Sequence, residues 1–545
     1  MSSRPDNIGR ATMWLASGTI VSRITGFISA AVLARTIGIT GLGADAFTLA
    51  NSLPNNLYTL IAGGVLNAVL VPQIVRAATR GDDGGAGFIN KLVTLSIVIL
   101  GIATTLLTLA TPVVVSMYGI TKLNTPVMDV AIGFGFWCMP QVFFYGLYTV
   151  LGEVLNARKM FGPFTWAPIL NNVVAIAGMI LFTHLFGSVP MDPAGEELFW
   201  GLPKIAVLAG TATLGVMAQA LILIFFWKRA GLKFRFDFGW RGVGFRAVGR
   251  MSGGAMGIMI AGQIAYIITT NVVMGSSASE NASTTALKYG YLIFVLPHSI
   301  ITVSITTAHL TRTSEYAALN NLVAVRNEFS EIMRSVLLPI VLAMFGVIVL
   351  ANPIARVFAG DNPAKAETLA LVIVGYMIGL LFFTIIFVVQ RTFYALSNTH
   401  TPLIFFIIQY SLQSILVILT GIFVDKQYLA FGASLTQGIA MMITAPIALY
   451  WLGKRLGVGL DGKNLTRSIS LFIGAGIVAS AAGYTLNTMM GGNTFEGFSS
   501  SSTGWVLSMA IVTVVMTVIY LGILMLFRSP DLKKMLAPIL RRIGR

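Results

Sequence analysis

Long apolar runs separated by short polar segments recur along the entire 545-residue chain. At roughly 20 residues, such a run can cross the hydrocarbon core of a bilayer as one α-helix. A helix also satisfies its own backbone hydrogen bonds, which lipid cannot do. The pattern predicts an all-α polytopic membrane protein with about fourteen transmembrane helices, at Met13–Thr36, Phe47–Ile74, Leu92–Tyr118, Val127–Leu151, Pro163–Phe186, Ile205–Phe226, Met251–Met274, Leu287–Leu310, Ser335–Leu350, Leu369–Val389, Leu403–Val424, Ala430–Leu452, Ile469–Leu486 and Trp505–Phe527.

Composition excludes a soluble domain with a membrane-anchoring tail. Hydrophobic residues make up 56% of the chain and charged residues only 10%, whereas soluble domains carry about 25% charged residues. The shortage of charge extends over the full length, and no loop between the predicted spans is long enough for a separate enzyme domain. The first apolar run is too long for a signal peptide and is predicted to remain as a span.

The net charge of +16 would suit nucleic-acid binding, but the distribution of the charges indicates membrane topology instead. With the N-terminus in the cytoplasm, most Lys and Arg residues fall in cytoplasmic loops and ends, including the loop before the seventh span and the C-terminal tail. This is the positive-inside pattern, and it also suits an anionic leaflet. Both termini are expected in the cytoplasm, and no nucleic-acid partner is expected.

A weak internal repeat divides the chain. Ser17-Gly18 in the first span matches Ser252-Gly253 in the seventh, and Leu53-Pro54 in the second span matches Leu296-Pro297 in the eighth. Repeated bundles around a central site are the architecture of secondary transporters. Two pseudo-symmetric six-helix lobes around a central cavity, followed by two C-terminal helices, are therefore predicted. The expected boundaries are 1–229 for the first lobe, 230–455 for the second lobe with a basic cytoplasmic linker at 230–250, and 456–545 for the last two spans and the basic tail.

Motifs of catalysis are missing from the sequence. It has no phosphate-binding glycine loop, no nucleophile elbow and no histidine pair at metal-ligand spacing. Cys138 is the only cysteine, which excludes a disulfide and a thiolate metal site. No enzymatic activity, metal or cofactor is expected.

The first predicted span carries the most informative polar face. Ser22, Arg23 and Gly26 recur with Thr19 and Ser29 at three- and four-residue steps, so they share one side of a helix. An arginine at bilayer depth costs several kcal/mol unless it faces water, a counter-charge or an anionic ligand. A structural ion pair is the alternative to a binding role.

Two further spans supply candidate residues. Asp45, Asn51 and Asn55 lie along the second span, and Lys288 and His298 lie on the eighth. The amides have an alternative role as hydrogen-bonding groups between helices. Lys288 could instead extend to the outer surface, and His298 could satisfy a carbonyl that Pro297 frees. A cavity with cationic and amide groups suits an anionic headgroup such as a phosphate or pyrophosphate. The residues alone therefore indicate a transporter with a polar, partly cationic central cavity.

The motifs of the first two spans resemble a known family. Ser22-Arg23-Ile-Thr-Gly26-Phe27, Ala44-Asp45-Ala-Phe47, Leu53-Pro54-Asn55 and Gly63-Gly64-Val-Leu66, in this order and spacing, resemble the MurJ (MviN) family of lipid II flippases, within the MOP exporter superfamily. Fourteen spans with two appended at the end are similar to that family's layout. The Leu-Pro-Asn-Asn-Leu-Tyr pattern resembles the actinobacterial branch, in a form without the pseudokinase extension that its members often carry.

The resemblance implies a function, a substrate and a location. It implies that lipid II, the undecaprenyl-pyrophosphate-linked peptidoglycan precursor, is moved from the inner to the outer leaflet of the bacterial plasma membrane by alternating access. Arg23 and Asp45 would belong to the central cavity, and the last two spans would hold the lipid tail. Membrane lipids and cell-wall synthesis proteins are further candidate partners.

The chain departs from the family at charged positions. Where many members carry arginines, it has Ser29, Tyr58 and Leu292, and where they carry an acid it has Gly63. Most of the family's cationic cavity is therefore replaced, leaving Arg23 with Lys288. Carboxylates for a sodium site are not visible in the seventh or eleventh span.

Other functions remain open from the sequence. Another MOP-type transporter, either a polysaccharide-lipid flippase or a cation-coupled drug antiporter, would fit the layout, although an antiporter needs a membrane carboxylate and Asp45 is the sole candidate. A non-transporting scaffold for cell-wall synthesis would use the basic loops but would leave the cost of Arg23 unexplained.

Overall fold

The computed structural model describes residues 5–61, 85–119, 122–158, 160–190, 192–239, 249–276 and 281–542, with the side chains of 5–16, 61, 161, 193, 249–253 and 538–542 excepted. Within these ranges every regular element is helical, as predicted. Twelve helices are long and apolar enough to span a membrane, and a thirteenth span is a helix pair bent by 41°. The remaining predicted span, Phe47–Ile74, is described only as far as Ile61, and the motif at Gly63-Gly64 lies outside the described residues.

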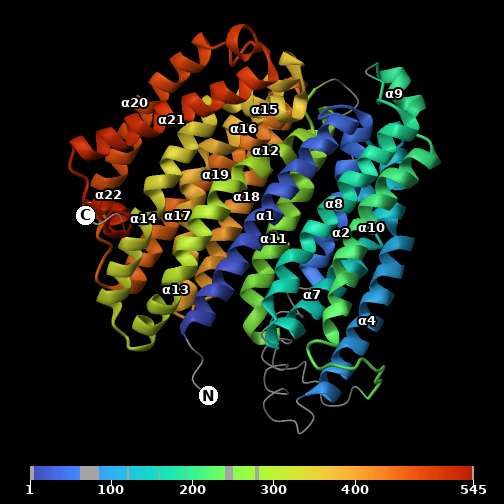
Figure 1. Ribbon diagram of the computed structural model, residues 1–545, viewed down its shortest axis with the longest axis horizontal. Coiled ribbons are helices and arrows are strands. Elements are labelled where there is room, and N and C mark those ends of the chain that lie inside the picture. The colour runs from blue at the N-terminus through green and yellow to red at the C-terminus, as the bar shows by residue number, and fades with distance from the viewer. Residues whose placement is uncertain are drawn as a thin grey trace. The chain divides into compact units, whose positions relative to one another are not determined.

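The chain forms two compact units, 1–280 and 281–545, and each is considered by itself. Unit 1 is built around a bundle of long helices (Figure 1). Its helices are α1 (Pro5–Ile37), α2 (Leu42–Ile61), α4 (Ala86–Leu109), α5 (Thr111–Met117), α6 (Pro126–Cys138), α7 (Gln141–Ala157), α8 (Phe161–Phe186), α9 (Pro193–Phe199), α10 (Leu202–Trp227) and α11 (Gly249–Val273).

Helix α11, the span with which the second lobe was expected to begin, is part of unit 1. The Asn271 side chain of α11 donates to the carbonyl of Met117 at the end of α5, at 2.9 Å, and Gln263 of α11 is hydrogen-bonded to Tyr118. The three-part division at 229 and 455 remains a prediction.

Two predicted spans of unit 1 are interrupted. The third breaks at Ala110, between α4 and α5, and the fourth at Met139-Pro140, between α6 and α7. Proline lacks the N–H that an uninterrupted helix would use, and it is well accommodated in the first turn of a new helix. Pro112 in α5 stands in such a first turn.

An aromatic cluster closes one end of unit 1. Phe134 of α6 lies 5.2 Å from Phe47 of α2 and 5.3 Å from Trp200, measured between ring centroids. Phe182 of α8 stacks on Trp200 at 6.0 Å. These rings hold α2, α6 and α8 to the segment that follows α9.

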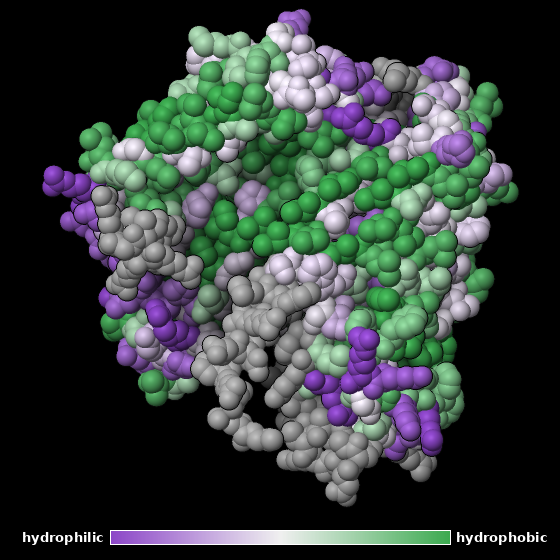
Figure 2. Space-filling model, in the orientation of Figure 1, coloured by the Kyte–Doolittle hydropathy of each residue, from purple (hydrophilic) through white to green (hydrophobic). Residues whose placement is uncertain are grey.

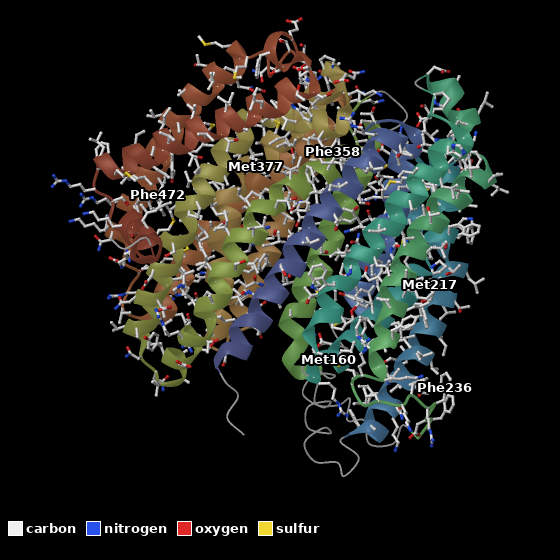
Figure 3. The ribbon with its side chains drawn as sticks, viewed as in Figure 1. Met160, Met217, Phe236, Phe358, Met377 and Phe472 are labelled. Carbon is white, nitrogen blue, oxygen red and sulfur yellow. The ribbon has the colours of Figure 1, made fainter. Side chains whose placement is uncertain are left out.

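Unit 2 is organised around one long helix, α14. Its helices are α12 (Thr284–Pro297), the π-helical turn η5 (His298–Thr302), α13 (Val303–Ala318), α14 (Leu322–Val349), α15 (Ala351–Ala359), α16 (Pro363–Ile378), α17 (Leu380–Ala395), α18 (His400–Phe423), α19 (Leu429–Leu456), α20 (Gly462–Met489), α21 (Ser502–Leu526) and α22 (Pro530–Arg542). The last two spans, α20 and α21, pack on α14, where the Tyr520 hydroxyl donates to the Leu338 carbonyl at 2.8 Å. Phe358, Met377 and Phe472 are buried in this unit (Figure 3).

The predicted ninth span begins too late. The sequence placed it at Ser335–Leu350, whereas α14 begins at Leu322. Its first turns carry Arg326, Glu328, Glu331 and Arg334, and this charge ended the apolar run without ending the helix. A helix that extends past the hydrocarbon core keeps its backbone bonds, so polarity marks the end of the apolar stretch but not of the helix.

The surface of both units is largely apolar. Figure 2 shows apolar side chains over much of the visible face of each unit, with hydrophilic ones gathered near α22, near the lower ends of α4 and α10, and along the upper edge. Leu106, Phe225, Ile422 and Val518 are among the large apolar side chains exposed on membrane-length helices. In water such a surface would drive association, whereas in lipid it is the expected outer face of a span.

Candidate functional site

The polar face of α1 packs against α8. The Asn172 side chain of α8 donates to the Ser22 carbonyl at 3.2 Å and to the Thr25 hydroxyl at 2.9 Å. A methyl group added at Gly26 would make ordinary contact with Asn172, at 3.6 Å. The α1–α8 contact thus involves the backbone of Ser22 and the side chain of Thr25, and Gly26 lies beside Asn172.

Arg23 lies half-buried on α1 beside this interface. It is fourteen residues from the end of α1 at Ile37, or about 21 Å at 1.5 Å per residue. Asp45 lies three residues into α2, or about 5 Å from the same end. The two residues thus differ in depth by roughly 15 Å, and they occupy different levels of unit 1.

Asp45 is completely buried in the first turn of α2. A carboxylate in a first turn is favoured by the partial positive charge of the helix N-terminus. Helix α9 contacts the same N-terminus, because Glu196 of α9 accepts a hydrogen bond from the Gly43 N–H at 2.9 Å. A side chain at Gly43 would collide with the Trp200 indole, about 2.2 Å from an added Cβ. Asp45 therefore sits at a tightly packed end of the unit.

A polar cavity of about 150 Å³ lies inside unit 1. Asn51 of α2 accepts from the Gln141 amide of α7 at 2.9 Å, and the same amide nitrogen reaches the Thr213 hydroxyl of α10 at 3.1 Å. The polar groups that line the cavity are amides and hydroxyls, from Ser29, Asn51, Gln141, Tyr145, Asn171, Asn172 and Thr211. Among the residues that the structure describes, the buried Gln141 Oε1 has no hydrogen-bond partner, so the cavity is suited to hold water.

Two of the departures from the family pattern fall in this region. Ser29 lines the cavity, and Tyr58 of α2 donates its hydroxyl to Thr149 of α7 at 2.5 Å while its ring stacks on Tyr145. Asn55, one turn before Tyr58, is exposed. Neutral hydrogen bonds thus join α2 to α7 at Asn51 and Tyr58.

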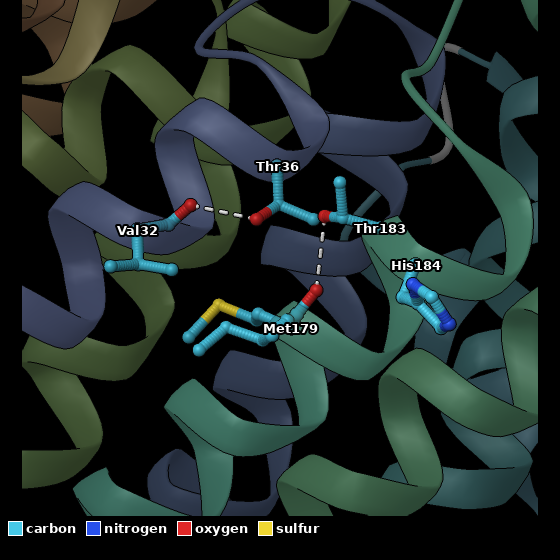
Figure 4. Close-up of a pocket in the computed structure, with 6 residues that line it drawn as sticks. Val32, Thr36, Met179, Thr183 and His184 are labelled. Carbon is cyan, nitrogen blue, oxygen red and sulfur yellow. Dashed lines mark hydrogen bonds between the residues drawn. The ribbon is translucent and has the colours of Figure 1, made fainter.

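A second pocket lies between the ends of α1 and α8 and has a volume of about 340 Å³. Figure 4 shows its lining, in which the Thr36 hydroxyl donates to the Val32 carbonyl at 2.8 Å and the Thr183 hydroxyl to the Met179 carbonyl at 3.0 Å. These hydroxyls are satisfied by their own helices. The pocket is therefore an apolar depression rather than a polar binding site.

The candidates of unit 2 lie on the eighth span. Lys288 is half-buried on α12. His298 is buried and begins the π-helical turn after Pro297, with its ring 4.2 Å from that of Phe383 and 4.9 Å from that of Phe387. Its Nδ1 atom has no hydrogen-bond partner among the described residues. A π-turn of this kind often marks a functional position in a helix.

A charged cluster of unit 2 was missed by the sequence reasoning. The Glu328 carboxylate of α14 accepts two bonds from Arg312 of α13, at 2.8 and 3.1 Å, and lies 2.6 Å from His309 Nδ1. His309 and Arg312 stand three residues apart, hence on one face of a helix, which is a signal that the sequence offered. The cluster joins α13 to α14, and among the described residues no group of acidic, histidine and cysteine side chains could hold a metal ion.

Comparison with known proteins identifies the family. The family model described as lipid II flippase MurJ matches residues 33–516. The probable lipid II flippase MurJ of Haemophilus influenzae is 27% identical over 404 residues, covering 70% of this chain and 75% of that protein. The corresponding protein of Rhizobium meliloti is 26% identical over 490 residues, covering 86% and 84%.

Solved structures agree on the fold. A lipid II flippase MurJ in an inward closed conformation superposes with a TM-score of 0.71 at 18% identity, covering 93% of this chain and 98% of that one. An inward-facing multidrug resistance MATE family transporter of the MOP superfamily gives 0.63 at 14% identity, covering 80% and 95%. The first confirms the all-helical membrane fold expected from the sequence, and the family match extends over most of the chain. This protein therefore belongs to the MurJ family of lipid II flippases.

Proposed function

We propose that this protein moves lipid II from the inner to the outer leaflet of the bacterial plasma membrane by alternating access. The observation that carries the proposal is the match of the lipid II flippase family model to residues 33–516. The likeness to MATE transporters is a likeness of fold at 14% identity. It adds support for a transporter architecture and none for a drug substrate.

The proposed substrate site is the polar face of the first span together with candidates on the second and eighth. Arg23 is assigned the main role, because it lies within the membrane-length part of α1 and a guanidinium binds phosphate oxygens in a bidentate manner. Ser22, Gly26, Asp45, Asn51 and Asn55 are proposed as further substrate-binding residues of unit 1. Lys288 and His298 are proposed as those of unit 2.

Alternating access requires helices that bend at defined places, and unit 2 offers two. The α16–α17 pair is bent by 41° at Gly379, where an added Cβ would come within 2.8 Å of Gly438 on α19. The π-turn at His298–Thr302 interrupts the eighth span. Sharp changes of helix direction arise at glycine pairs and π-turns, so we assign the bending to these two positions.

Depletion of the protein in its host tests the function. Lipid-linked precursor should accumulate on the inner face of the plasma membrane, and the cells should lyse. A labelled reagent that reaches only the outer leaflet would report the exposed lipid II. Normal outward exposure of lipid II in depleted cells would reject the proposal.

The proposed function includes an orientation of the chain in the membrane, with both termini in the cytoplasm. The concentration of Lys and Arg in alternate loops favours both termini in the cytoplasm. A reporter that is active only in the cytoplasm, fused after Arg545, is expected to be active. A reporter placed in the segment between α8 and α9 is expected to be silent.

A further inference from the structure

A groove at the end of the last span, α21, has no part in the proposed transport of lipid II. The groove lies where α21 ends and α22 begins, and its volume is about 480 Å³. Met525, Leu532 and Leu536 give it an apolar floor, and Arg528 and Lys533 stand at its rim. The combination of an apolar floor and a basic rim is local to this corner of unit 2.

The turn between the two helices holds Arg528 in an unfavourable backbone conformation. The Arg528 N–H donates to the Met525 carbonyl and the Ser529 N–H to the Leu524 carbonyl, both at 2.9 Å. Arg528 has a φ of +51°, in the left-handed region where helix ends favour glycine or asparagine. A residue kept in a strained conformation points to a use for its side chain.

The acidic residue of α22, Asp531, contacts other helices of unit 2 and does not line the groove. Asp531 is the only acid in the sequence of α22. Its carboxylate accepts a hydrogen bond from the Ser468 hydroxyl of α20 at 2.7 Å and lies 3.3 Å from the Arg334 guanidinium of α14. With that charge engaged inside the unit, the exposed side of α22 presents Lys533 and Lys534 and is cationic.

The position of the groove indicates what lies against it. Leu526 and Phe527, at the end of a membrane-length helix, are exposed beside it, so the neighbouring molecules are lipids. A short amphipathic helix with a basic edge lies in the interfacial region of a bilayer, and juxtamembrane Lys and Arg attract anionic headgroups. Charge-assisted bonds from a guanidinium and an ammonium suit a phosphate.

We propose that the groove between α21 and α22 is a binding site for an anionic phospholipid of the inner leaflet. Arg528 and Lys533 bind the headgroup phosphate, and an acyl chain lies along Met525, Leu532 and Leu536. The site is independent of lipid II transport, and it would fasten the end of the last span to the membrane surface.

Native mass spectrometry of the full-length protein, released from a neutral detergent, tests the site. Phosphatidylglycerol and phosphatidylcholine with identical acyl chains are the two probes, and inorganic phosphate is the competitor. The wild-type protein should retain one phosphatidylglycerol more tightly than phosphatidylcholine, and millimolar phosphate should not displace it, because the chain contributes to binding.

The variants isolate the two basic groups. Arg528→Gly with Lys533→Gln should weaken phosphatidylglycerol binding by roughly 5-fold for each basic side chain removed, and leave phosphatidylcholine binding unchanged. Glycine adopts the left-handed conformation without strain, so the lipid-free melting temperature of Arg528→Gly should stay the same or rise. Lys534→Gln removes the same charge from the neighbouring position and is the matched control.

Three results would overturn the site. Equal retention of the two lipids would exclude headgroup recognition, and unchanged binding by the double variant would exclude Arg528 and Lys533. A loss in Lys534→Gln equal to that in Lys533→Gln would show attraction to a diffuse basic surface instead of a built groove.

Discussion

At the scale of single residues, the arginine of the first span differs in chemistry from the side chains that line the cavity of unit 1. Arg23 stands half-buried on α1, whereas the internal cavity is lined at Asn51 and Gln141 by amides that hydrogen-bond to each other. A guanidinium gains most from an anionic ligand, and an amide network gains from filling its own hydrogen-bonding capacity. The first is therefore assigned to the charged part of the substrate, and the second also holds α2, α7 and α10 together.

Replacement of Arg23 tests the first assignment. Arg23→Ala should fail to support growth of a strain depleted of the protein while still inserting in the membrane, because a charged hydrogen-bond donor contributes about 1.5–3 kcal/mol, or roughly ten- to a hundred-fold in affinity. Growth and membrane content by immunoblot are measured together. Arg35→Ala, on the exposed side of the same helix, should support growth. Growth on Arg23→Ala would contradict the assignment.

Replacement of Gln141 tests the second assignment. Gln141→Leu removes the donor to both Asn51 and Thr213, at 2.9 and 3.1 Å, and should destabilise the protein by about 1–3 kcal/mol because it leaves buried acceptors unsatisfied. Thr213→Val also removes the bond from the Thr213 hydroxyl to the Trp137 carbonyl, but it keeps the shorter Gln141–Asn51 bond and should cost less. Thermal unfolding in detergent ranks the two variants against the wild type. A Gln141→Leu protein as stable as the wild type would show that the hydrogen bonds of Gln141 do not stabilise the fold.

At the scale of elements, one buried arginine anchors the loop that joins the last two spans. Arg356 of α15 donates to the Ser499 carbonyl at 2.6 Å and to the Ser500 carbonyl at 3.3 Å, in the loop between α20 and α21. Its guanidinium also lies over the rings of Phe495 and Trp505. Trp505 in turn donates to the Pro353 carbonyl at 3.1 Å. This loop is thus held to α15 along its second half, up to the first turn of α21.

Removal of that arginine should release the loop. Arg356→Gln loses charge-assisted bonds worth about 1.5–3 kcal/mol, so a glutamate-specific protease should cleave faster after the exposed Glu496. The cleavage is followed by gel electrophoresis of the purified protein. Lys365→Gln, on the neighbouring α16, removes a positive charge without touching the loop and should be cleaved at the wild-type rate. Equal cleavage of all three proteins would show that Arg356 does not anchor the loop.

At the scale of the whole molecule, the sequence was sufficient to predict the membrane spans but not the contacts between them. Apolar runs of membrane length predicted the helices because lipid enforces helical backbone. The breaks at Ala110 and Gly379 were missed, since a break is stabilised by packing that no single run displays. The shared face of Ser22 and Gly26 was correctly inferred from helical periodicity, but its partner, Asn172 of α8, depends on tertiary structure.

The same limit applies to the candidate site. Arg23 could be selected from the sequence because a charge inside an apolar run is rare and costly. Gln141 could have been selected in the same way, as a polar residue inside the predicted fourth span, but Thr213 and Thr211 are indistinguishable from the many threonines that bond to their own helix. Residues of that kind are recognised only when the fold brings them to one cavity.

The most direct test of the account is lipid II translocation by the purified protein in liposomes. Labelled lipid II placed in one leaflet should become accessible in the other with the wild-type protein and with Arg35→Ala, but not with Arg23→Ala. The measurement is made with and without a membrane potential and sodium, which also identifies the coupling. The account would be contradicted if the wild-type protein translocated lipid II no faster than protein-free liposomes do under all of these conditions. It would also be contradicted if Arg23→Ala translocated lipid II as fast as the wild type.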